Sequence, residues 1–505
     1  MPTDRRLTVG RLLERQASQR PEQPLLICDG AVRTYGEADR RSADLAVALV
    51  GLGAGQGTHV GVLYPNGADF VVAMLAAARI GAVVIPCSTF ATAPELQSQL
   101  LHSDTEILLA TSSFRGNDYT TRLAGLTAPW LRHIVFDGRT DACANPAMVR
   151  ALADDVDGAD PLAIIYTSGS TGTPKGAVHT HAALLSQQHH LNEIRGLHAE
   201  DRLFCTSPFF WIGGFAFALL ATLVAGSTLV CSNATDPAVT LDLLEAVRPT
   251  LTNGFAAGVA HLARHESFAR RDLSSLRRGN LYPIMAPGAR PADPELRHNM
   301  LGMTEAGSVV LLSEDDTDQP EHRRGSFGHP APGFATRIVN PETGQDVAAG
   351  EVGELLLRGE YLMQHYYKRS REDCFTADGW FATGDLVRTD HDGFYYYLGR
   401  LGSMIKTAGA NVSPAEVERA IATVTGGLTA HVVGLPDAER GQAVAAVIVV
   451  PDGVAGDCES LRQRLRSELS AYKLPRRIVW VPPSAVPLMS SGKVDVRRLP
   501  ELFDV

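Results

Sequence analysis

Residues 166–176 read Tyr166-Thr-Ser-Gly-Ser-Thr-Gly-Thr-Pro-Lys-Gly176. The apolar run Leu162–Tyr166, which is typical of a buried strand, leads directly into this stretch. Glycines let backbone N–H groups approach an anion closely, and the hydroxyl side chains add donors. Lys175 adds a positive charge suited to a polyphosphate. The stretch is not a Walker loop, because Pro174 and Gly176 flank the lysine where that motif has Gly and Ser/Thr. A flexible linker is the alternative, but the position after a strand favours a phosphate loop.

The segments before and after this loop alternate between short β-rich runs and helical stretches. Val60–Leu63 and Val83–Ile85 are predicted as strands, and Phe70–Arg79 between them as an apolar helix. Such a βαβ succession implies parallel strands whose two faces are covered. Beyond residue 350 the strands become shorter, as in Gly353–Arg358 and Phe394–Leu398. This change predicts a small β-barrel-like region that closes the first domain.

A second, smaller domain is predicted after a boundary near Arg400–Ser403. Ser413 precedes a proline and is expected to cap a helix, and Val444–Val450 is predicted as a strand. We therefore expect an α/β fold, with a large multi-subdomain N-terminal domain of parallel sheets over residues 1–400. Residues 401–505 are expected to form a small α+β domain.

Composition narrows the class of protein. The 505 residues are too many for one core, and 45% hydrophobic with 20% charged residues is ordinary for a globular protein. A net charge of −10 argues against a nucleic-acid partner. Seven cysteines without a CxxC pair are expected to be reduced thiols. Residues 1–10 lack an apolar leader, and Phe215–Cys231 fits a buried helix and strand better than a membrane span. We therefore expect a cytoplasmic protein.

Five further motifs follow the loop in a set order. They are Gly288-Ala289, Leu301-Gly-Met-Thr-Glu305, Trp380-Phe-Ala-Thr-Gly-Asp385, the stretch from Gly399 to Glu418, and Pro487 to Leu499. With the loop they resemble the motifs of the adenylate-forming superfamily, which comprises acyl- and aryl-CoA synthetases, luciferases and peptide-synthetase adenylation domains. The resemblance covers nearly the whole chain, and six motifs in order do not arise by chance.

The resemblance implies a two-step reaction. A carboxylic acid would react with ATP to give an acyl adenylate and pyrophosphate, and the acyl group would then pass to coenzyme A. Because two anions meet in the first step, the site must neutralise charge and hold an in-line geometry.

The resemblance also implies a role for each matching residue. Lys493, Thr304, Glu305 and Lys175 would be catalytic, with Glu305 binding Mg²⁺ and Lys493 bridging the substrate carboxylate and the α-phosphate. Asp385 would accept both ribose hydroxyl protons. The full set expected at ATP or AMP is Thr167, Ser168, Gly169, Ser170, Thr171, Gly172, Thr173, Lys175, Gly288, Ala289, Leu301, Gly302, Met303, Thr304, Asp385 and Arg400.

A rotation of the small domain is implied as well. After adenylation it would turn about a hinge at Ser403, withdraw Lys493 and bring Gly409 to the path of the thiol. A glycine there permits close approach of a narrow pantetheine arm. A plain turn glycine is the alternative for Gly409.

The acyl pocket is expected, again by resemblance, at Asn253 to Gly258 and at Phe209, Phe210, Trp211, Gly213 and Gly214. Peptide-synthetase domains have an Asp near the Phe209 segment that pairs with an α-ammonium group, and Phe210-Trp211 offers no carboxylate there, so an amino acid is disfavoured. An apolar fatty or aryl acid is favoured. Packing of the core is an equally good explanation of Phe209 and Phe210.

Three features depart from the family pattern. Leu301 replaces an aromatic residue that stacks on adenine, and Ser403 replaces the Asp or Lys of the hinge. Only Ala292 to Met300 separate two motifs that are normally joined by a helix and a strand. Such a deletion would remove a strand beside the acyl pocket.

Two other functions remain open. A stand-alone adenylation enzyme would load the phosphopantetheine of an acyl or peptidyl carrier protein. A degenerate nucleotide- or acyl-binding protein would explain the three departures. The retention of Lys175, Thr304, Glu305, Asp385 and Lys493 favours an enzyme, and a small-molecule acid is the expected partner.

Overall fold

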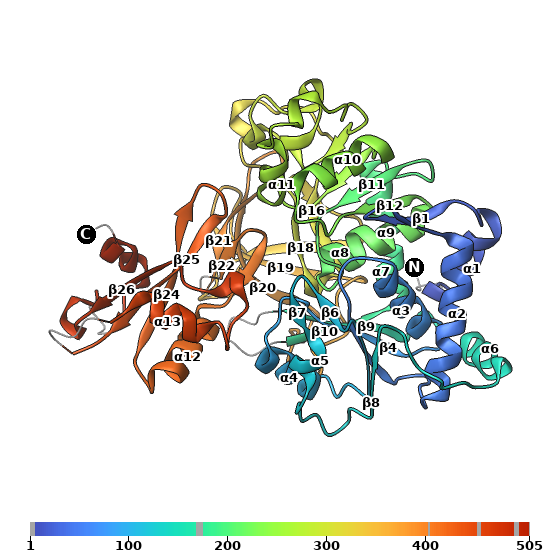
Figure 1. Cartoon of the computed structure of the whole chain (residues 1–505). Helices are drawn as coiled ribbons and strands as arrows, with labels where there is room; N and C mark the ends of the chain where they lie inside the picture. Colours follow the sequence, from blue (N-terminus) through green and yellow to red (C-terminus); the bar gives the residue numbers. More distant parts are fainter. Residues whose placement is uncertain (1–5, 168–174, 402–403, 452–455, 489–493, 504–505) are drawn as a thin grey trace. The chain divides into compact units, whose positions relative to one another are not determined.

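The computed structural model describes residues 6–167, 175–401, 404–451, 456–488 and 494–503 (Figure 1). Contacts between Cα atoms divide the chain into two compact units. The first comprises Met1–Thr89, Leu100–Tyr166 and Gly176–Gly399, and the second comprises Phe90–Gln99, Thr167–Lys175 and Arg400–Val505. The predicted α/β class is confirmed, with parallel sheets in the large part and a small α+β domain at the C-terminus.

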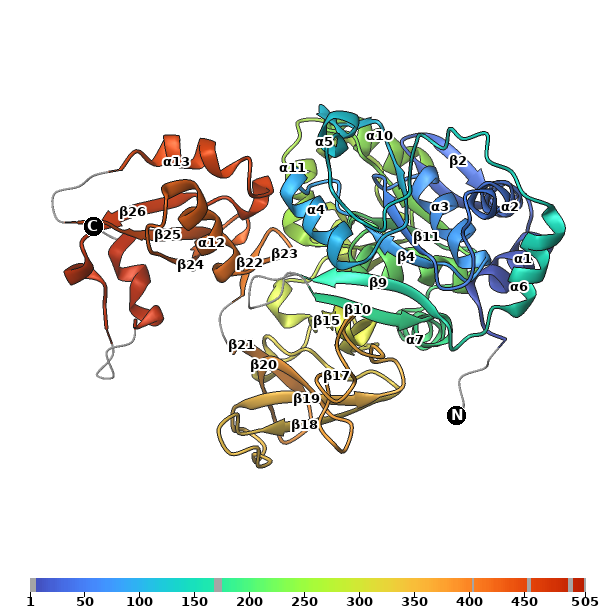
Figure 2. The ribbon, with the colours of Figure 1, turned by 90° about the horizontal axis from the view of Figure 1, so that it is seen from below.

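One six-stranded sheet carries the strands on both sides of the glycine-rich loop. Its order is β10 (Lys175–Thr180), β9 (Pro161–Thr167), β4 (Val83–Pro86), β3 (His59–Leu63), β5 (Ile107–Ala110) and β8 (His133–Phe136). Strands β3, β4, β5 and β8 pair in parallel, and β4 also pairs in parallel with β9. The predicted helix between β3 and β4 is confirmed as α3 (Ala68–Arg79). β9 and β10 lie side by side (Figure 2), so the strands before and after the glycine-rich stretch are neighbours in one sheet.

A second six-stranded sheet provides the other parallel layer. Its order is β14 (Arg278–Gly279), β13 (Leu251–Asn253), β11 (Arg202–Cys205), β12 (Thr228–Cys231), β1 (Pro24–Cys28) and β2 (Ala31–Thr34). All pairs are parallel except β1 with β2.

Several helices of the first unit pack on one another, and two sets lie next to the parallel sheets. The first contains α1 (Val9–Gln19), α2 (Tyr35–Gly51) and α3, and the second contains α7 (His181–Arg195) and α9 (Ala221–Ala225). The apolar stretch that resembles a membrane span folds as a buried π-helix, Phe215–Leu220, followed by α9 and β12. Within the described residues, no helix combines the length and the apolar character that crossing a membrane requires.

The described part of the first unit also contains two larger antiparallel sheets, besides the short pair β6 (Ser113–Phe114) and β7 (Asn117–Asp118). The first contains β15 (Leu301–Met303), β16 (Ser308–Leu312) and β17 (His329–Pro330), and the second contains β18 (Phe334–Val339), β19 (Gly353–Gly359), β20 (Phe381–Thr389) and β21 (Tyr395–Arg400). The predicted strands at 353–358 and 394–398 are thus β19 and β21. A shared apolar core contains Leu301, Met303 and Phe381 together with Ala177 of β10. This core joins the two sheets to the strand that follows the loop.

The short segment 292–300 closes without the helix and strand that the family pattern predicts. It contains only a 3₁₀ turn, Pro294–Leu296, and the second parallel sheet ends at β14. Backbone and side-chain contacts tie the segment to residues 318–326. The Ala292 N–H donates to Asp318 Oδ2 over 2.8 Å, and the Asn299 N–H donates to the Ser326 carbonyl over 2.7 Å. Hydrogen bonds to residues 318–326 therefore hold the shortened connection in place.

The C-terminal part of the second unit is an α+β fold, drawn in orange to red in Figure 1. Its strands are β22 (Ile405–Thr407), β23 (Ala410–Val412), β24 (Ala430–Asp437), β25 (Gly441–Val449) and β26 (Arg477–Val481), and its helices are α12 (Pro414–Thr425) and α13 (Cys458–Leu465). Ser413 caps α12 as predicted, since its Oγ accepts the Glu416 N–H over 3.4 Å.

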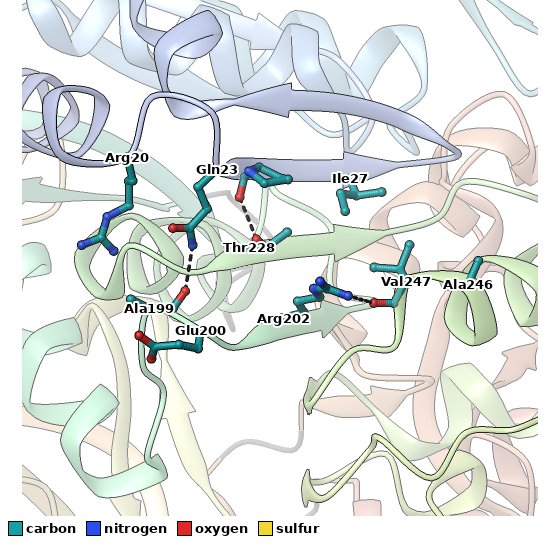
Figure 3. A pocket seen from close by; sticks show the side chains of 10 residues that line it. Arg20, Gln23, Ile27, Ala199, Glu200, Arg202, Thr228, Ala246 and Val247 are labelled. Atoms are coloured by element: carbon teal, nitrogen blue, oxygen red, sulfur yellow. Dashed lines mark hydrogen bonds between the residues drawn. The ribbon is translucent and has the colours of Figure 1, made fainter.

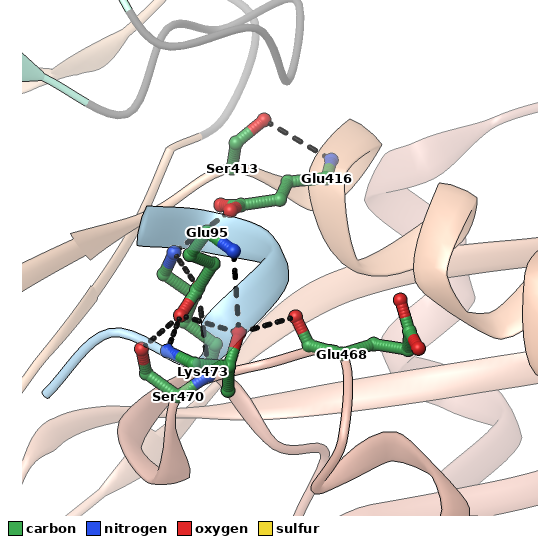
Figure 4. A network of polar contacts seen from close by, with 7 residues as sticks. Glu95, Ser413, Glu416, Glu468, Ser470 and Lys473 are labelled. Carbon is green, nitrogen blue, oxygen red and sulfur yellow. Dashed lines mark hydrogen bonds and ion pairs between the residues drawn. The ribbon is translucent and has the colours of Figure 1, made fainter. Parts of the chain in front are cut away.

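A buried ionic network holds another segment of this unit, Phe90–Gln99, to the C-terminal fold (Figure 4). Lys473 Nζ lies 2.6 Å from Glu95 Oε1 and 2.7 Å from Glu416 Oε1. Glu95 lies on α4 (Ala93–His102) and also accepts the Ser470 hydroxyl over 2.6 Å. Burial acts to lower the pKa of Lys473, but nearby Tyr472 and the two carboxylates raise it well above its usual range. The lysine is therefore charged at neutral pH, and both carboxylates have a cationic partner.

Candidate active site

A tight turn after β15 carries two of the residues expected at the reacting phosphate. Thr304–Ala306 forms one 3₁₀ turn, and the Gly307 N–H closes it by donating to the Thr304 carbonyl over 3.0 Å. Gly307 has φ = 72°, and a Cβ there would lie 2.7 Å from Gln187 Oε1. Only glycine suits both conditions. The turn leaves the Thr304 side chain half-buried and Glu305 buried.

Glu305 is held by the segment that follows β19. Its Oε1 accepts the Tyr366 hydroxyl over 2.7 Å, and its carbonyl accepts the Met363 N–H over 2.8 Å. Among the described residues, Oε2 accepts no hydrogen bond. A carboxylate fixed through one oxygen and open at the other suits a hard cation such as Mg²⁺. The side chain present therefore fits the metal that the family resemblance implies.

A histidine of β10, the strand that begins at Lys175, contacts the same turn. His179 Nε2 lies 2.7 Å from the Thr304 carbonyl. Because a carbonyl only accepts, Nε2 is assigned the proton. Burial lowers the pKa of His179 to about 4, although the hydrogen bond to the Thr304 carbonyl acts to raise it, so the ring is neutral at pH 7. The sequence motifs pointed to neither His179 nor Tyr366, which both act through contacts distant in sequence.

Asp385 lies on β20, at a kink in the antiparallel sheet. Gly384 has φ = 74° and its N–H donates to Glu354 Oε1 over 2.9 Å. The Asp385 N–H donates to Thr383 Oγ1 over 3.0 Å. Phe381 on the same strand packs edge-to-face on Tyr366, with ring centroids 6.5 Å apart. The strand of Asp385 therefore shares a core with the residue that holds Glu305.

The other described residues of the first unit that are predicted to bind the nucleotide differ in their exposure to solvent. Gly288 and Ala289 belong to a 3₁₀ turn, Pro287–Ala289, where Gly288 is exposed with open space around it. Leu301 is 5% exposed and packs in the core beside Met303, whereas Gly302 is exposed.

Several predicted residues fall in the second unit or outside the described residues. Thr167, Lys175, Arg400 and Gly409 belong to the second unit. Those outside the described residues are Ser168, Gly169, Ser170, Thr171, Gly172, Thr173, Ser403 and Lys493. Their roles stay predictions.

The first acyl segment follows β11. Phe209 is fully buried against Phe70, with ring centroids 5.5 Å apart, and Phe210 is also buried. Trp211 is partly exposed and meets Phe210 edge-to-face at 5.7 Å. A Cβ at Gly214 would lie 2.1 Å from the Pro208 carbonyl oxygen, so the backbone there needs glycine. Phe209 and Phe210 thus pack in the core, whereas Trp211 keeps exposed surface; the pocket role of these side chains stays a prediction.

The second acyl segment follows β13 and contacts the first. The Asn253 amide donates to the Gly213 carbonyl over 3.4 Å, and the Asn253 carbonyl accepts the Thr206 N–H over 3.1 Å. Phe255, two residues on, is 45% exposed. Ligands of open parallel sheets bind outside the carboxyl ends of the strands. The ends of β11 and β13 therefore form a suitable place for an apolar ligand.

An open cavity of about 640 Å³ lies instead at the amino ends of β1, β11 and β12 (Figure 3). Its polar side chains bond to nearby backbone. Arg20 donates to the Gly226 carbonyl over 2.9 Å, and Gln23 donates to the Ala199 carbonyl over 2.8 Å. The Thr228 hydroxyl donates to the Pro24 carbonyl over 2.7 Å. These bonds join strands and loops, and nothing about the cavity indicates a ligand.

Two family models match this chain, one over most of the first unit and one over the C-terminal domain. The family of AMP-binding enzymes matches residues 13–367, and its C-terminal domain matches residues 416–493. The chain belongs to this family. The resemblance inferred from the six motifs is thereby confirmed.

Individual relatives are similar over almost their whole length. A feruloyl-CoA synthase from Amycolatopsis sp is 31% identical, covering 96% of this chain and 97% of the relative. The solved anthranilate CoA ligase AuaEII, in complex with anthranoyl-AMP, is 26% identical with a TM-score of 0.69 and covers 100% of this chain and 98% of its own. The amide bond synthetase McbA from Marinactinospora thermotolerans is 25% identical with a TM-score of 0.81, over 98% and 99% of the two chains.

Proposed function

We propose that this family member is an AMP-forming acid–thiol ligase. One carboxylate oxygen of the acid attacks the α-phosphorus of ATP, pyrophosphate leaves, and an acyl adenylate forms. The thiol of coenzyme A then attacks the acyl carbon, AMP leaves, and the thiol proton is released. The observation that carries the proposal is the Thr304–Ala306 turn, whose Glu305 is fixed by Tyr366 with one oxygen still open.

The chain's own residues supply binding and orientation in this scheme. Thr304 donates its hydroxyl to the α-phosphate, Lys175 faces the outer phosphates, and Asp385 accepts the ribose hydroxyls. Mg²⁺, when bound at Glu305, neutralises phosphate charge as a hard cation with oxygen ligands. Lys493 bridges the carboxylate and the α-phosphate in the first step. Donors placed where charge develops favour the transition state over the bound substrate.

We expect the substrate to be an apolar acid without a second charge. Residues 206–214 and 253–258 contain no charged side chain, and Trp211 and Phe255 are aromatic and partly exposed. A buried ammonium group would stay unpaired there. A pyrophosphate-release screen with ATP and Mg²⁺ should give the highest kcat/KM for aryl or fatty acids, with free amino acids at least about 10-fold lower. Free amino acids as the best substrates would contradict the pocket assignment, and no release with any acid would contradict the proposed function.

The acceptor is tested in the same screen. The similarity to a feruloyl-CoA synthase favours a thiol as the acceptor of the acyl group. The similarity to an amide bond synthetase makes an amine a second candidate for the acceptor. Reactions are therefore run with CoA, with a phosphopantetheinylated carrier protein and with a simple amine. We expect turnover to require CoA; release of AMP with transfer to the amine or to the carrier instead would change the acceptor and leave the adenylation step in place.

Asp385→Ala should weaken binding of a non-hydrolysable ATP analogue by about 10- to 100-fold, because hydrogen bonds to a charged acceptor contribute about 1.5–3 kcal/mol. Isothermal titration calorimetry in the presence of Mg²⁺ measures the change. Asp392→Ala is the matched control, since that aspartate is exposed and pairs with Arg323. Equal affinity of Asp385→Ala and the unchanged protein would exclude Asp385 from the ribose site.

A further inference from the structure

Three consecutive backbone carbonyls of the Thr304–Ala306 turn are each held by a different segment. The Thr304 carbonyl accepts from His179 over 2.7 Å, and the Glu305 carbonyl accepts from the Met363 N–H over 2.8 Å. The Ala306 carbonyl accepts from Gln187 Nε2 over 2.9 Å. The turn itself supplies one further partner, the Gly307 N–H on the Thr304 carbonyl, so the Glu305 and Ala306 carbonyls depend on donors from other segments. Of the three donors, His179 is the one on β10, three residues after Gly176.

His179 is placed for this contact by the alternation of its strand. Ala177 and His179 share a face of β10, and Ala177 packs in the core that includes Met303 and Ala306. The imidazole is 1% exposed, and its Nδ1 has no hydrogen-bond partner among the described residues. A leucine or valine would fill this strand position without any buried polar atom. The bond to the Thr304 carbonyl is therefore what a polar donor adds at this position and an apolar side chain does not.

β10 is fixed on its other side by the segment that holds Glu305. The Tyr367 N–H donates to the Gly176 carbonyl over 2.7 Å, and the Val178 N–H donates to the His365 carbonyl over 3.1 Å. Tyr366, between them, donates its hydroxyl to Glu305 over 2.7 Å. The strand after the loop, the Thr304 turn and the Tyr366 segment thus form a closed set of contacts.

We infer that His179 is a positioning residue for the adenylation step. Its Nε2–H fixes the Thr304 carbonyl, and with it the direction of the Thr304 hydroxyl and the Glu305 carboxylate relative to β10. This inference rests on the proposed function, which assigns Thr304 to the α-phosphate and Glu305 to the cation. Groups that orient a metal ligand or catalytic donor typically change metal affinity or activity by about 10- to 100-fold when they are lost.

His179→Leu should slow formation of the acyl adenylate by about 10- to 100-fold in single-turnover experiments. The same variant, given presynthesised adenylate and CoA, should form thioester within about 3-fold of the normal rate, because that step does not use the outer phosphates. The Mg²⁺ concentration that half-saturates binding of a non-hydrolysable ATP analogue, measured by calorimetry, should rise. His179→Gln keeps an amide N–H of similar reach and should recover most of the rate.

His181→Leu is the matched control. His181 is two residues further on and equally buried, but its ring accepts the Val9 N–H over 3.2 Å and, among the described residues, makes no hydrogen bond to Thr304. The His181→Leu variant should lower the melting temperature without changing the ratio of the rates of the two half-reactions. If His179→Leu slows both half-reactions equally, or if His179→Gln recovers nothing, the positioning role is wrong. His179→Met replaces the leucine variant if the latter does not fold.

Failure of the proposed function can be told apart from failure of this inference. If the unchanged protein makes no adenylate from any acid, the ligase proposal fails, whatever the histidine does. The calorimetric comparison still applies in that case: weaker binding of the Mg²⁺–ATP analogue by His179→Leu, but not by His181→Leu, supports the positioning role, and equal binding overturns it.

Discussion

Replacing Lys493 by alanine should lower the rate of acyl-adenylate formation by about 10²–10³, because a preorganised donor to a developing charge contributes about that much. Lys493 belongs to the C-terminal lysine motif, which the family's C-terminal domain match includes at its end. In the proposed mechanism it bridges the substrate carboxylate and the α-phosphate. Rapid-quench measurement of adenylate in a single turnover tests this directly.

The second half-reaction should separate this role from a general defect. Lys493→Ala, given presynthesised acyl adenylate and CoA, should form thioester at close to the normal rate. Arg497→Ala is the matched control, because that nearby cation is 85% exposed and pairs only with Asp495 among the described residues. It should leave both steps unchanged. Equal loss of both steps in the Lys493 variant would mean that the two steps do not use separate domain positions.

The fold could be predicted from sequence wherever the signal is local. β3, α3 and β4 follow from apolar runs of strand and helix length, and the start of α12 follows from the Ser413 cap. The buried helix and strand within 215–231 follow from the glycine that interrupts the apolar stretch at residue 226. In each case a short window contains both the pattern and the contacts that satisfy it.

The remaining features depend on contacts between distant residues. Glu95 meets Lys473 across 378 residues, so no local pattern could place Phe90–Gln99 in the second unit. Tyr366 reaches Glu305 across 61 residues, and His179 reaches Thr304 across 125. The histidine that follows Ala177 and Val178 in β10 was the visible signal of that contact, since a buried polar side chain needs a partner.

In the candidate site, too, some features follow from local sequence patterns and others depend on contacts between distant residues. The motifs located Thr304, Glu305 and Asp385, but they did not show that one core connects these residues to β10. The sequence leaves open whether Phe209 and Phe210 line a pocket or pack in the core, and only the structure shows that both are buried in a core cluster. Burial also describes Leu301, the residue in the place of an aromatic one: its side chain packs in the core, while Gly302 next to it is exposed. Sequence therefore indicates chemistry, whereas long-range packing decides which side chains are accessible.

Gly409→Leu should have the opposite effect to Lys493→Ala: thioester formation should fall by at least about 10²-fold, and adenylate formation should stay within about 3-fold. Ala408 and Gly409 form the two-residue turn between β22 and β23, with φ of 49° and 85° and with Thr407 paired to Ala410. Positive φ at both central residues is the geometry of a type I′ hairpin, which favours glycine in the second position. In the proposed mechanism this turn borders the path of the thiol, and a leucine side chain would block it.

Backbone strain must be separated from obstruction of that path, because a non-glycine residue in the left-handed region costs about 1–2 kcal/mol wherever it occurs. Gly426→Leu supplies the comparison: Gly426 ends α12 with φ = 74°, and a Cβ there meets nothing within 4 Å. Both variants should lose similar stability in thermal melts, but only Gly409→Leu should lose the thioester step. If Gly426→Leu loses it as well, strain in the small domain explains the defect. If neither variant loses it, Gly409 is a turn glycine, and the acceptor approaches the adenylate by another route.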